Sequence, residues 1–189
     1  MVPVILIAAG DWRSLRKPVS ILPWGSVTVI EHILDIISHS SASPVIVVLG
    51  HEAWSIRKKI EGCSVQIVVD DWHKLGLPSW IRCGLRAIPA EAQAVIIASC
   101  DQPAVPASVF DGLIEAHRSS GRGMIVPSYS GRRGRPVLFD LGRYGHQLLA
   151  LGPGAALDEI AEQSPGDVLE MPVATPAVVT DISAERPLL

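Results

Sequence analysis

The stretch LIAAGDWRSLRKPVSILPWG (residues 6–25) joins an apolar run to a loop of small and positively charged residues. The small residues would let backbone N–H groups approach a ligand closely, and Arg13, Arg16 and Lys17 follow directly. Such a loop after a buried strand is suited to hold an anion, most commonly the phosphates of a nucleotide. It has neither the GxGxxG pattern of dinucleotide-binding folds nor the GK[ST] ending of a P-loop. An ordinary strand-to-helix turn with solvated arginines is the alternative.

Apolar runs of strand length alternate with amphipathic segments along the rest of the chain. The pattern predicts strands at 2–8, 43–50, 64–71 and 94–101, and helices at 27–40, 51–62, 79–88 and 106–120. Two strands joined by a Gly/Arg loop are expected in 123–140, then two short helical stretches, and strands at 166–173 and 177–182. Val/Ile runs alternating with helices indicate an α/β fold, a mostly parallel sheet with helices on both faces. We predict a single domain over residues 1–189.

Composition narrows the class of protein. Hydrophobic residues make up 48% of the 189 residues and charged residues 19%, which favours a globular protein over a disordered one. The net charge of -3 argues against a general nucleic-acid binder, and no apolar run reaches the roughly 20 residues of a membrane-spanning helix. The three cysteines form no CxxC pair and the N-terminus reads as a strand. We therefore expect a cytoplasmic protein with no membrane and no nucleic-acid partner.

Carboxylates stand where two of the apolar runs end. In parallel α/β sheets ligands bind beyond the carboxyl ends of the strands, which makes Asp70, Asp71 and Asp101 candidates for one site. Asp101 follows the run AVIIASC and is placed to hold a divalent metal through oxygen ligands, and Asp181 in VVTDIS is a similar carboxylate. Each alone could equally be a cap or turn residue. Beside the basic glycine loop, the pair favours a metal–phosphate site.

The segment SGRRGRP (residues 130–136) adds a second group of cations. Arg132, Arg133 and Arg135 are flanked there by glycines. Guanidinium groups suit phosphate recognition because their planar fork pairs with two oxygens. A solvated hairpin tip is the alternative and is the commoner fate of such loops.

Five motifs occur in one order along nearly the whole chain. They are LIAAG with LPWG, GLPSWIRCGL, AVIIASCDQP, SYSGRRGRPVLFD and VVTDIS. In this order and spacing they resemble the MobA-like NTP transferases, and the branch that looks most similar is the molybdenum-cofactor cytidylyltransferases. The resemblance implies a nucleotide-diphospho-sugar-transferase-like (Rossmann-like) α/β fold. It also implies transfer of a nucleoside monophosphate from an NTP to the phosphate of molybdopterin, with Mg²⁺ as cofactor and diphosphate as product.

The resemblance also assigns roles to residues. Ala8, Ala9 and Gly10 would contact the nucleotide through their backbone, and their AAG form resembles the cytidine-using branch. Asp101 matches the metal-binding aspartate of the family motif DxP, and Asp181 matches a second acidic position. Ser79 would contribute to nucleotide binding.

The remaining assignments concern the cations. Arg13 and Lys17 do not fall on matched family positions but lie near them; they would act in catalysis by stabilising the leaving diphosphate, with help from Arg135, or could equally point into solvent. Arg133 and Arg135 would bind the acceptor substrate.

Several positions depart from the family pattern. The family arginine and lysine of the first loop fall on Ser14 and Val19, and a motif serine falls on Trp80. Arg135 stands where the family has the histidine of GHP. The nucleotide-binding loop is therefore degenerate. A lysine placed at position 19 is expected to extend toward solvent or ligand.

Three functions are consistent with these residues. The first is transfer of CMP from CTP to molybdopterin, with CTP preferred over GTP. The second is a degenerate, non-catalytic member that binds a nucleotide or pterin, or serves as partner of a molybdoenzyme or its maturation factor. The third is a nucleotidyltransferase with a different phosphorylated acceptor.

Overall fold

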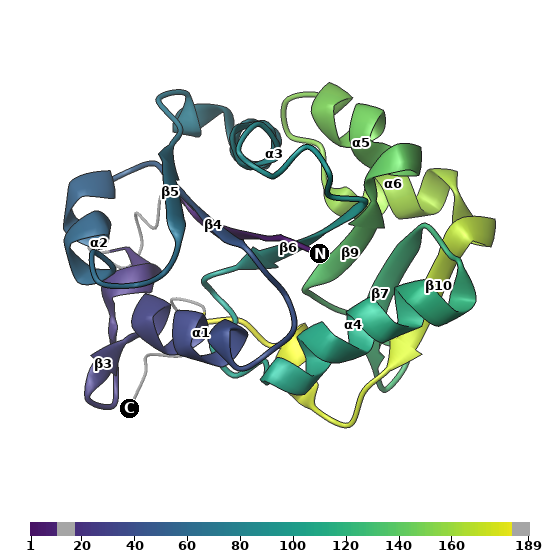
Figure 1. Ribbon diagram of the computed structural model, residues 1–189, viewed down its shortest axis with the longest axis horizontal. Coiled ribbons are helices and arrows are strands. Elements are labelled where there is room, and N and C mark those ends of the chain that lie inside the picture. The colour runs from purple at the N-terminus through teal and green to yellow at the C-terminus, as the bar shows by residue number, and fades with distance from the viewer. Residues whose placement is uncertain (11–17, 183–189) are drawn as a thin grey trace.

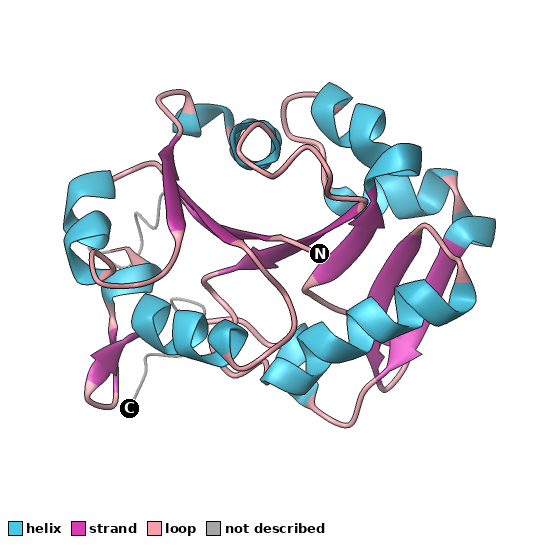
Figure 2. Cartoon of the chain, viewed as in Figure 1, coloured by secondary structure: helices cyan, strands magenta, loops and turns pink. Residues whose placement is uncertain are grey.

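A twisted eight-stranded sheet crosses the molecule, with helices on both of its faces (Figures 1 and 2). The computed structural model describes residues 1–10 and 18–182. The strand order is β10-β7-β9-β6-β1-β4-β5, and the short β8 pairs with β7. The strands are β1 (Val4–Ala8), β4 (Val45–Leu49), β5 (Gln66–Val69), β6 (Ala94–Ser99), β7 (Met124–Tyr129), β8 (Arg132–Arg133), β9 (Val137–Asp140) and β10 (Val168–Pro172). The predicted α/β class is confirmed.

Strand direction decides which chain ends meet at one edge of the sheet. β1 pairs in parallel with β4 and β6, and β4 pairs in parallel with β5. β9 is antiparallel to both of its neighbours, β6 and β7. The residues that precede β9 therefore lie at the same edge as the residues that follow β6. This reversal brings Arg135 toward Asp101.

Two apolar layers hold the helices to the sheet. One layer joins α1 (Val29–Ser38), α2 (Ala53–Lys59) and α4 (Ala107–Ser120) to one face, and the other joins α3 (Leu77–Leu85), α5 (Leu141–Ala150) and α6 (Leu157–Gln163) to the opposite face (Figure 1). Neighbouring β1 residues point to opposite faces, and Ile5 and Leu6 are both fully buried. A strand covered on both sides needs apolar residues at every position, which explains the continuous Val/Ile runs.

Helix α1 shows how sequence pattern and cap set an element. Its buried residues are Val29, Ile30, Ile33, Leu34 and Ile37, the positions expected from helical spacing. The helix begins after Thr28, whose backbone N–H donates to the Glu31 carboxylate at 2.8 Å in a capping box. It starts later than the expected range 27–40 because β3 (Val27–Thr28) pairs with β2 (Pro23–Trp24).

The predicted strand over 177–182 is wrong. Residues Pro176–Val179 form a 3₁₀ helix, η5, instead. Pro176 occupies the first helical turn, where its missing N–H costs nothing. The Thr175 hydroxyl accepts a hydrogen bond from the N–H of Ala177 at 3.2 Å. This local capping outweighs the strand preference of the valines that follow.

A hydrogen-bonded carboxylate ties the start of β7 to α5. Asp167 accepts bonds from the Gly123 N–H at 3.0 Å, the Arg143 guanidinium at 2.6 Å and the Tyr144 hydroxyl at 2.9 Å. Burial by itself raises the pKa of Asp167, but these donors outweigh it and hold the pKa below its ordinary value of 3.8. The ionised carboxylate is therefore part of the folded state.

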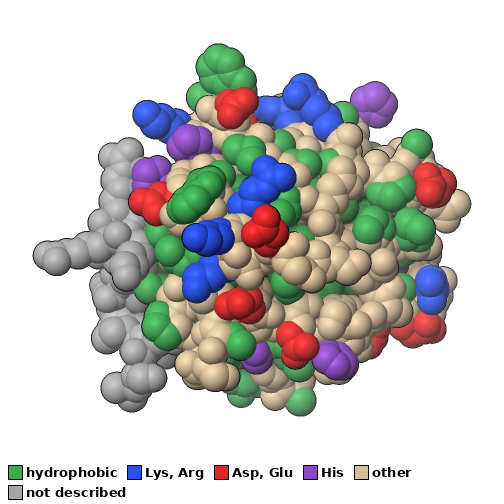
Figure 3. All heavy atoms as spheres, turned by 60° about the vertical axis from the view of Figure 1, so that its left-hand side comes forward, with side chains coloured by type: hydrophobic (Ala, Val, Ile, Leu, Met, Phe, Trp, Pro, Cys, Tyr) green, Lys and Arg blue, Asp and Glu red, His purple; other side chains and the backbone are tan. Residues whose placement is uncertain are grey.

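The side of the molecule that carries α2 and β5 exposes several large apolar side chains. Trp54, Val69, Trp72 and Leu75 are all exposed there, and Lys58 places its ammonium 5.3 Å from the centre of the Trp54 ring. Figure 3 shows side chains of both charges interspersed among hydrophobic ones on this face. In the described part of the chain, every helix is too short or too polar to cross a bilayer.

Candidate functional site

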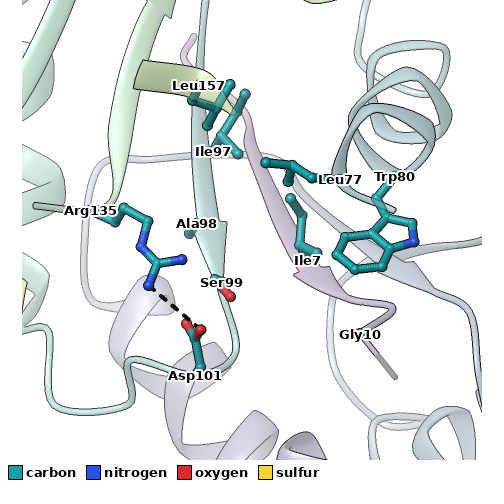
Figure 4. A pocket seen from close by; sticks show the side chains of 10 residues that line it. All are labelled: Ile7, Gly10, Leu77, Trp80, Ile97, Ala98, Ser99, Asp101, Arg135 and Leu157. Atoms are coloured by element: carbon teal, nitrogen blue, oxygen red, sulfur yellow. Dashed lines mark ion pairs between the residues drawn. The ribbon is translucent and has the colours of Figure 1, made fainter. Parts of the chain in front are cut away.

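A cavity of about 330 Å³ opens at the carboxyl ends of β1 and β6 (Figure 4). Its walls are mostly apolar, with Ile7 and Ile97 from the two strands and Leu77 from α3. Two charged side chains, Asp101 and Arg135, point toward one another at its side. We call it the Asp101 cavity. An apolar cavity with a few converging polar groups at this edge of an α/β sheet is the usual form of a ligand site.

Asp101 follows the last residues of β6 and is only 7% exposed. Its Oδ2 lies 3.6 Å from a terminal nitrogen of Arg135. Its Oδ1 is buried and has no hydrogen-bond partner among the described residues. A buried carboxylate oxygen without a partner is costly, so it calls for a ligand such as a cation or a bound donor.

Asp181 completes a group of three charges. The same terminal nitrogen of Arg135 lies 3.6 Å from Oδ2 of Asp181. Next to it, the N–H of Ile182 donates to the carbonyl oxygen of Asp101 at 2.7 Å. The two aspartates expected as metal ligands are thus brought together, with a guanidinium between them. Within residues 1–10 and 18–182, no group of three or more His, Cys, Asp or Glu side chains is placed to hold a metal.

The residues that could hold Mg²⁺ offer the type of ligand atom that it prefers. Asp101 offers a buried, unpartnered carboxylate oxygen, and Asp181 offers a second carboxylate nearby. Hard divalent cations prefer oxygen ligands of this type. The metal role of both residues stays a prediction.

Arg135 is held in place by its main chain. Its N–H donates to the carbonyl oxygen of Val178 in η5 at 2.8 Å, and the Gly134 N–H donates to Pro127 at 2.7 Å. Gln102, which directly follows Asp101, donates from its side chain to the same Val178 oxygen at 3.0 Å. The sequence analysis did not single out Gln102, although its position between Asp101 and Pro103 in the DQP motif indicated that it lies at the site.

The first glycine loop begins at the Asp101 cavity. Ala8 and Ala9 are buried at the end of β1, and Gly10 lines the cavity. A Cβ atom on Gly50 would lie 2.9 Å from the Ala9 carbonyl oxygen, so the end of β4 also needs small residues here. Nucleotide contact through this backbone remains a prediction. Arg13 and Lys17, the expected catalytic cations, lie outside the described residues, as does Ser14.

Val19 corrects an expectation about the first loop. It is fully buried in a short 3₁₀ helix, η2 (Val19–Ile21), and packs in the apolar core. A lysine at this position would be buried in the core and could not extend freely toward solvent. Counting positions along the sequence gave no information on which way the side chain at position 19 faces.

The neighbours Ser79 and Trp80 line different cavities. Ser79 is buried and lines a separate cavity together with Asp70 and Arg82, on the β5 side of α3. Trp80 lines the Asp101 cavity, and its indole N–H donates to the His73 carbonyl oxygen at 2.9 Å. Adjacent residues on a helix point in different directions, so of these two only Trp80 lines the Asp101 cavity. The expected nucleotide contact of Ser79 is therefore not at the Asp101 cavity.

A second cavity of about 280 Å³ adjoins the first and is lined by Arg132, Arg133 and Arg135; we call it the arginine cavity. Arg135 lines both cavities. The Arg133 Nε donates to the Glu170 carboxylate at 2.7 Å, in a half-exposed ion pair. The structure therefore places the two expected substrate-binding arginines together. Of these two, only Arg135 also faces the aspartates.

Cys100 lies directly before Asp101 and is fully buried. Burial, and then the charge of Asp101, raise the pKa of its thiol far above the ordinary value. The thiol is therefore protonated at neutral pH. This rules out a thiolate nucleophile at this position.

Comparison with known proteins identifies a domain family for most of the chain. The model of the MobA-like NTP transferase domain matches residues 4–168. Among curated proteins, the "Bifunctional protein GlmU" of Mycolicibacterium smegmatis is 28% identical over 125 residues. That match covers 61% of this chain and 26% of the relative, so the chain spans about a quarter of the relative's length.

Solved structures share the fold over almost the whole chain. The Rv0371c homologue from Mycobacterium sp. strain JC1 superposes with a TM-score of 0.80 at 28% identity, covering 91% of this chain and 85% of that one. Rv0371c of Mycobacterium tuberculosis, solved in complex with manganese, superposes with a TM-score of 0.77 at 21% identity, covering 91% and 88%. The family model covers most of the chain, and the fold of the chain superposes on these structures. The chain belongs to the family of MobA-like NTP transferase domains.

Proposed function

We propose that the protein is a nucleotidyltransferase that transfers CMP from CTP to the phosphate of molybdopterin. The observation that carries the proposal is the Asp101 cavity, which is lined both by Gly10 after β1 and by Asp101 after β6. The family match over residues 4–168 supports nucleotidyl transfer as the reaction class. The choice of CTP rests on the AAG form of residues 8–10.

In the proposed reaction, an oxygen of the acceptor phosphate attacks the α-phosphorus of the nucleotide. A new P–O bond forms there, the bond to the bridging oxygen breaks, and diphosphate leaves. A bound divalent metal would supply positive charge to the phosphate oxygens, and Asp101 and Asp181 would hold it. The chain itself positions both substrates and stabilises the charge that develops, which is the main task of enzymes of this class.

The arginine cavity supports an anionic acceptor. It adjoins the Asp101 cavity through the shared side chains of Leu77, Arg135 and Leu157. A phosphate held there by the guanidinium groups of Arg132 and Arg135 would lie next to the nucleotide. A phosphorylated acceptor of another kind would use the same groups, so molybdopterin is the first acceptor to test.

Trp80 supports recognition of a base by stacking. Its ring is fixed by the bond to the His73 carbonyl and faces the cavity near Gly10 (Figure 4). Stacking of a base on an aromatic side chain contributes about 1–3 kcal/mol. The large indole also leaves less room at this position than the serine of the family motif, which favours the smaller pyrimidine base.

A second candidate is nucleotide binding without turnover. The observation that favours it is the loss of a cation at position 19, where a buried valine replaces the family lysine. Loss of one preorganised charge-stabilising group typically costs about 10²–10³ in rate. Arg13 and Lys17 would have to take over its role for turnover to persist.

Calorimetry with CTP, GTP and ATP, each with and without Mg²⁺, tests the proposal. We expect CTP to bind more tightly than GTP, and Asp101→Asn to remove the Mg²⁺-dependent part of binding. Asp35→Asn, an exposed carboxylate on α1, is the matched control and should bind as the parent does. Tighter binding of GTP would overturn the base assignment, and equal binding by Asp101→Asn would make Asp101 a turn residue.

Release of diphosphate from CTP in the presence of molybdopterin tests the transfer itself. Turnover that requires molybdopterin would support the full proposal. Binding of CTP without release of diphosphate would favour the second candidate. Binding of none of the nucleotides by the folded protein would overturn both.

A further inference from the structure

The charges at the Asp101 cavity are arranged around a cation that the chain itself supplies. A single terminal nitrogen of Arg135 lies 3.6 Å from one oxygen of Asp101 and 3.6 Å from one oxygen of Asp181. The dashed line in Figure 4 marks the first of these ion pairs. The guanidinium therefore lies between the two carboxylates that would otherwise share a divalent metal.

The backbone fixes all three residues relative to one another. The N–H of Arg135 donates to Val178 in η5, and the N–H of Ile182 donates to the Asp101 carbonyl oxygen. The geometry thus depends on main-chain hydrogen bonds and not on a chance meeting of long side chains. In contrast, the Arg135 side chain is 42% exposed, so the core does not enclose its guanidinium.

Asp101 provides independent evidence that a further ligand belongs here. Although Oδ2 faces Arg135, its Oδ1 is buried without a hydrogen-bond partner among the described residues. The ion pair with Arg135 involves Oδ2, and its 3.6 Å separation is longer than a hydrogen bond. It therefore leaves Oδ1 without a partner in the described part of the chain. The site therefore retains capacity for a cation that the guanidinium only partly meets.

We propose that Arg135 is an internal competitor for the divalent metal, which must displace its guanidinium from Asp101 and Asp181 to bind. The inference deepens the proposed function and rests on its metal site, not on nucleotide transfer. Arg135 also lines the arginine cavity, so the displaced guanidinium has a place to go. An anion bound there attracts the guanidinium away from the carboxylates and thereby promotes metal entry.

Binding of Mn²⁺ without nucleotide, followed by the electron paramagnetic resonance signal of the free ion, tests the proposal. We expect Arg135→Gln to bind Mn²⁺ at least about tenfold more tightly than the parent, because a like charge a few ångströms away is removed. Arg135→Lys keeps the charge and should stay close to the parent. Arg118→Gln is the matched control, since Arg118 is exposed in the last turn of α4 and lines neither cavity, so Mn²⁺ affinity should stay unchanged.

Three further measurements make the test decisive. Adding Asp101→Asn to Arg135→Gln should abolish the gain in affinity, and inorganic phosphate should tighten Mn²⁺ binding in the parent but not in Arg135→Gln. The melting temperature of Arg135→Gln should rise more with Mn²⁺ than that of the parent, which gives a readout independent of resonance. Equal or weaker Mn²⁺ binding by Arg135→Gln, or tight binding by Arg135→Lys, would overturn the proposal. Because no nucleotide is present, these outcomes are independent of whether CTP binds.

Discussion

Gly134→Ala is expected to destabilise the protein through a single backbone contact. A Cβ atom at position 134 would lie 2.3 Å from the carbonyl oxygen of Val178 and 2.7 Å from its carbonyl carbon. Real Cβ atoms do not approach backbone so closely, so η5 or the loop before β9 must move. Val178 is fully buried, which leaves η5 little room to retreat.

The expected loss of stability follows from the packing around Val178 and the hydrogen bonds that its carbonyl oxygen accepts. Overpacking a tight site costs about 1–3 kcal/mol. The displaced oxygen also accepts hydrogen bonds from Arg135 and Gln102, and each such bond contributes about 0.5–1.5 kcal/mol. Replacing glycine by alanine offsets roughly 0.4–1 kcal/mol of this by restricting the unfolded chain. We therefore expect a loss of about 3 kcal/mol, with the packing and hydrogen-bond terms dominant.

Thermal unfolding followed by circular dichroism measures this loss. For a chain of this size, 1 kcal/mol corresponds to about 2–4 °C, so the melting temperature should fall by about 6–12 °C. Gly152→Ala is the matched control, because in the described part of the chain no atom lies within 4 Å of its added Cβ. Its melting temperature should stay within about 2 °C of the parent. A Gly134→Ala variant that melts with the parent would refute the reasoning.

Three further outcomes test separate features. Val19→Lys should lower the free energy of unfolding by about 3 kcal/mol or more, because it buries an ammonium group in the core. The control Val27→Lys, at a position that is 42% exposed, should change the free energy of unfolding little. Equal stability of the two variants would contradict the burial of position 19. Because the pKa of Asp167 is lower in the folded state, its carboxylate stabilises the fold at pH values above the unfolded pKa near 3.8. The loss of unfolding free energy in Asp167→Asn, measured by urea unfolding, should therefore be complete at pH 7 and become smaller as the pH falls through the folded pKa. A cost that is the same at pH 7 and well below pH 3.8 would speak against this. The Cys100 thiol should react with a thiol reagent only when the protein unfolds, after Cys63; early labelling of Cys100 would show that the segment before Asp101 opens.

Sequence pattern was sufficient for the elements whose burial is local. The five apolar positions of α1 repeat at helical spacing, the Val/Ile runs of β1 and β6 are continuous, and the structure buries both as expected. The η5 segment was predicted wrongly because its valines favour a strand, while Pro176 and the Thr175 cap set a helical turn. In this segment local hydrogen bonding outweighs the strand propensity of the valines.

The site could be predicted only in part. Strand ends at one edge of a parallel sheet brought Asp101 into consideration, and the chain does place it there. That Arg135 lies between two carboxylates follows from the reversed direction of β9, which residue types alone do not encode. The inward orientation of Val19 and the fixed ring of Trp80 likewise depend on tertiary packing.

The hydrogen bond between Ile182 and Asp101 has a consequence for how the protein is made. Ribosomes add about 5–20 residues per second, so Asp181 is synthesised about 4–16 s after Asp101. During that interval the nascent chain already contains β1, β4 and β6, and the pairings of β1 with β4 and β6 involve only residues that precede Asp101. The second carboxylate and the backbone bond that anchors it arrive last among the described residues. A cation or nucleotide that needs both carboxylates can therefore bind only after residues 181 and 182 have been made, and the strands that precede them must form the sheet without that stabilisation.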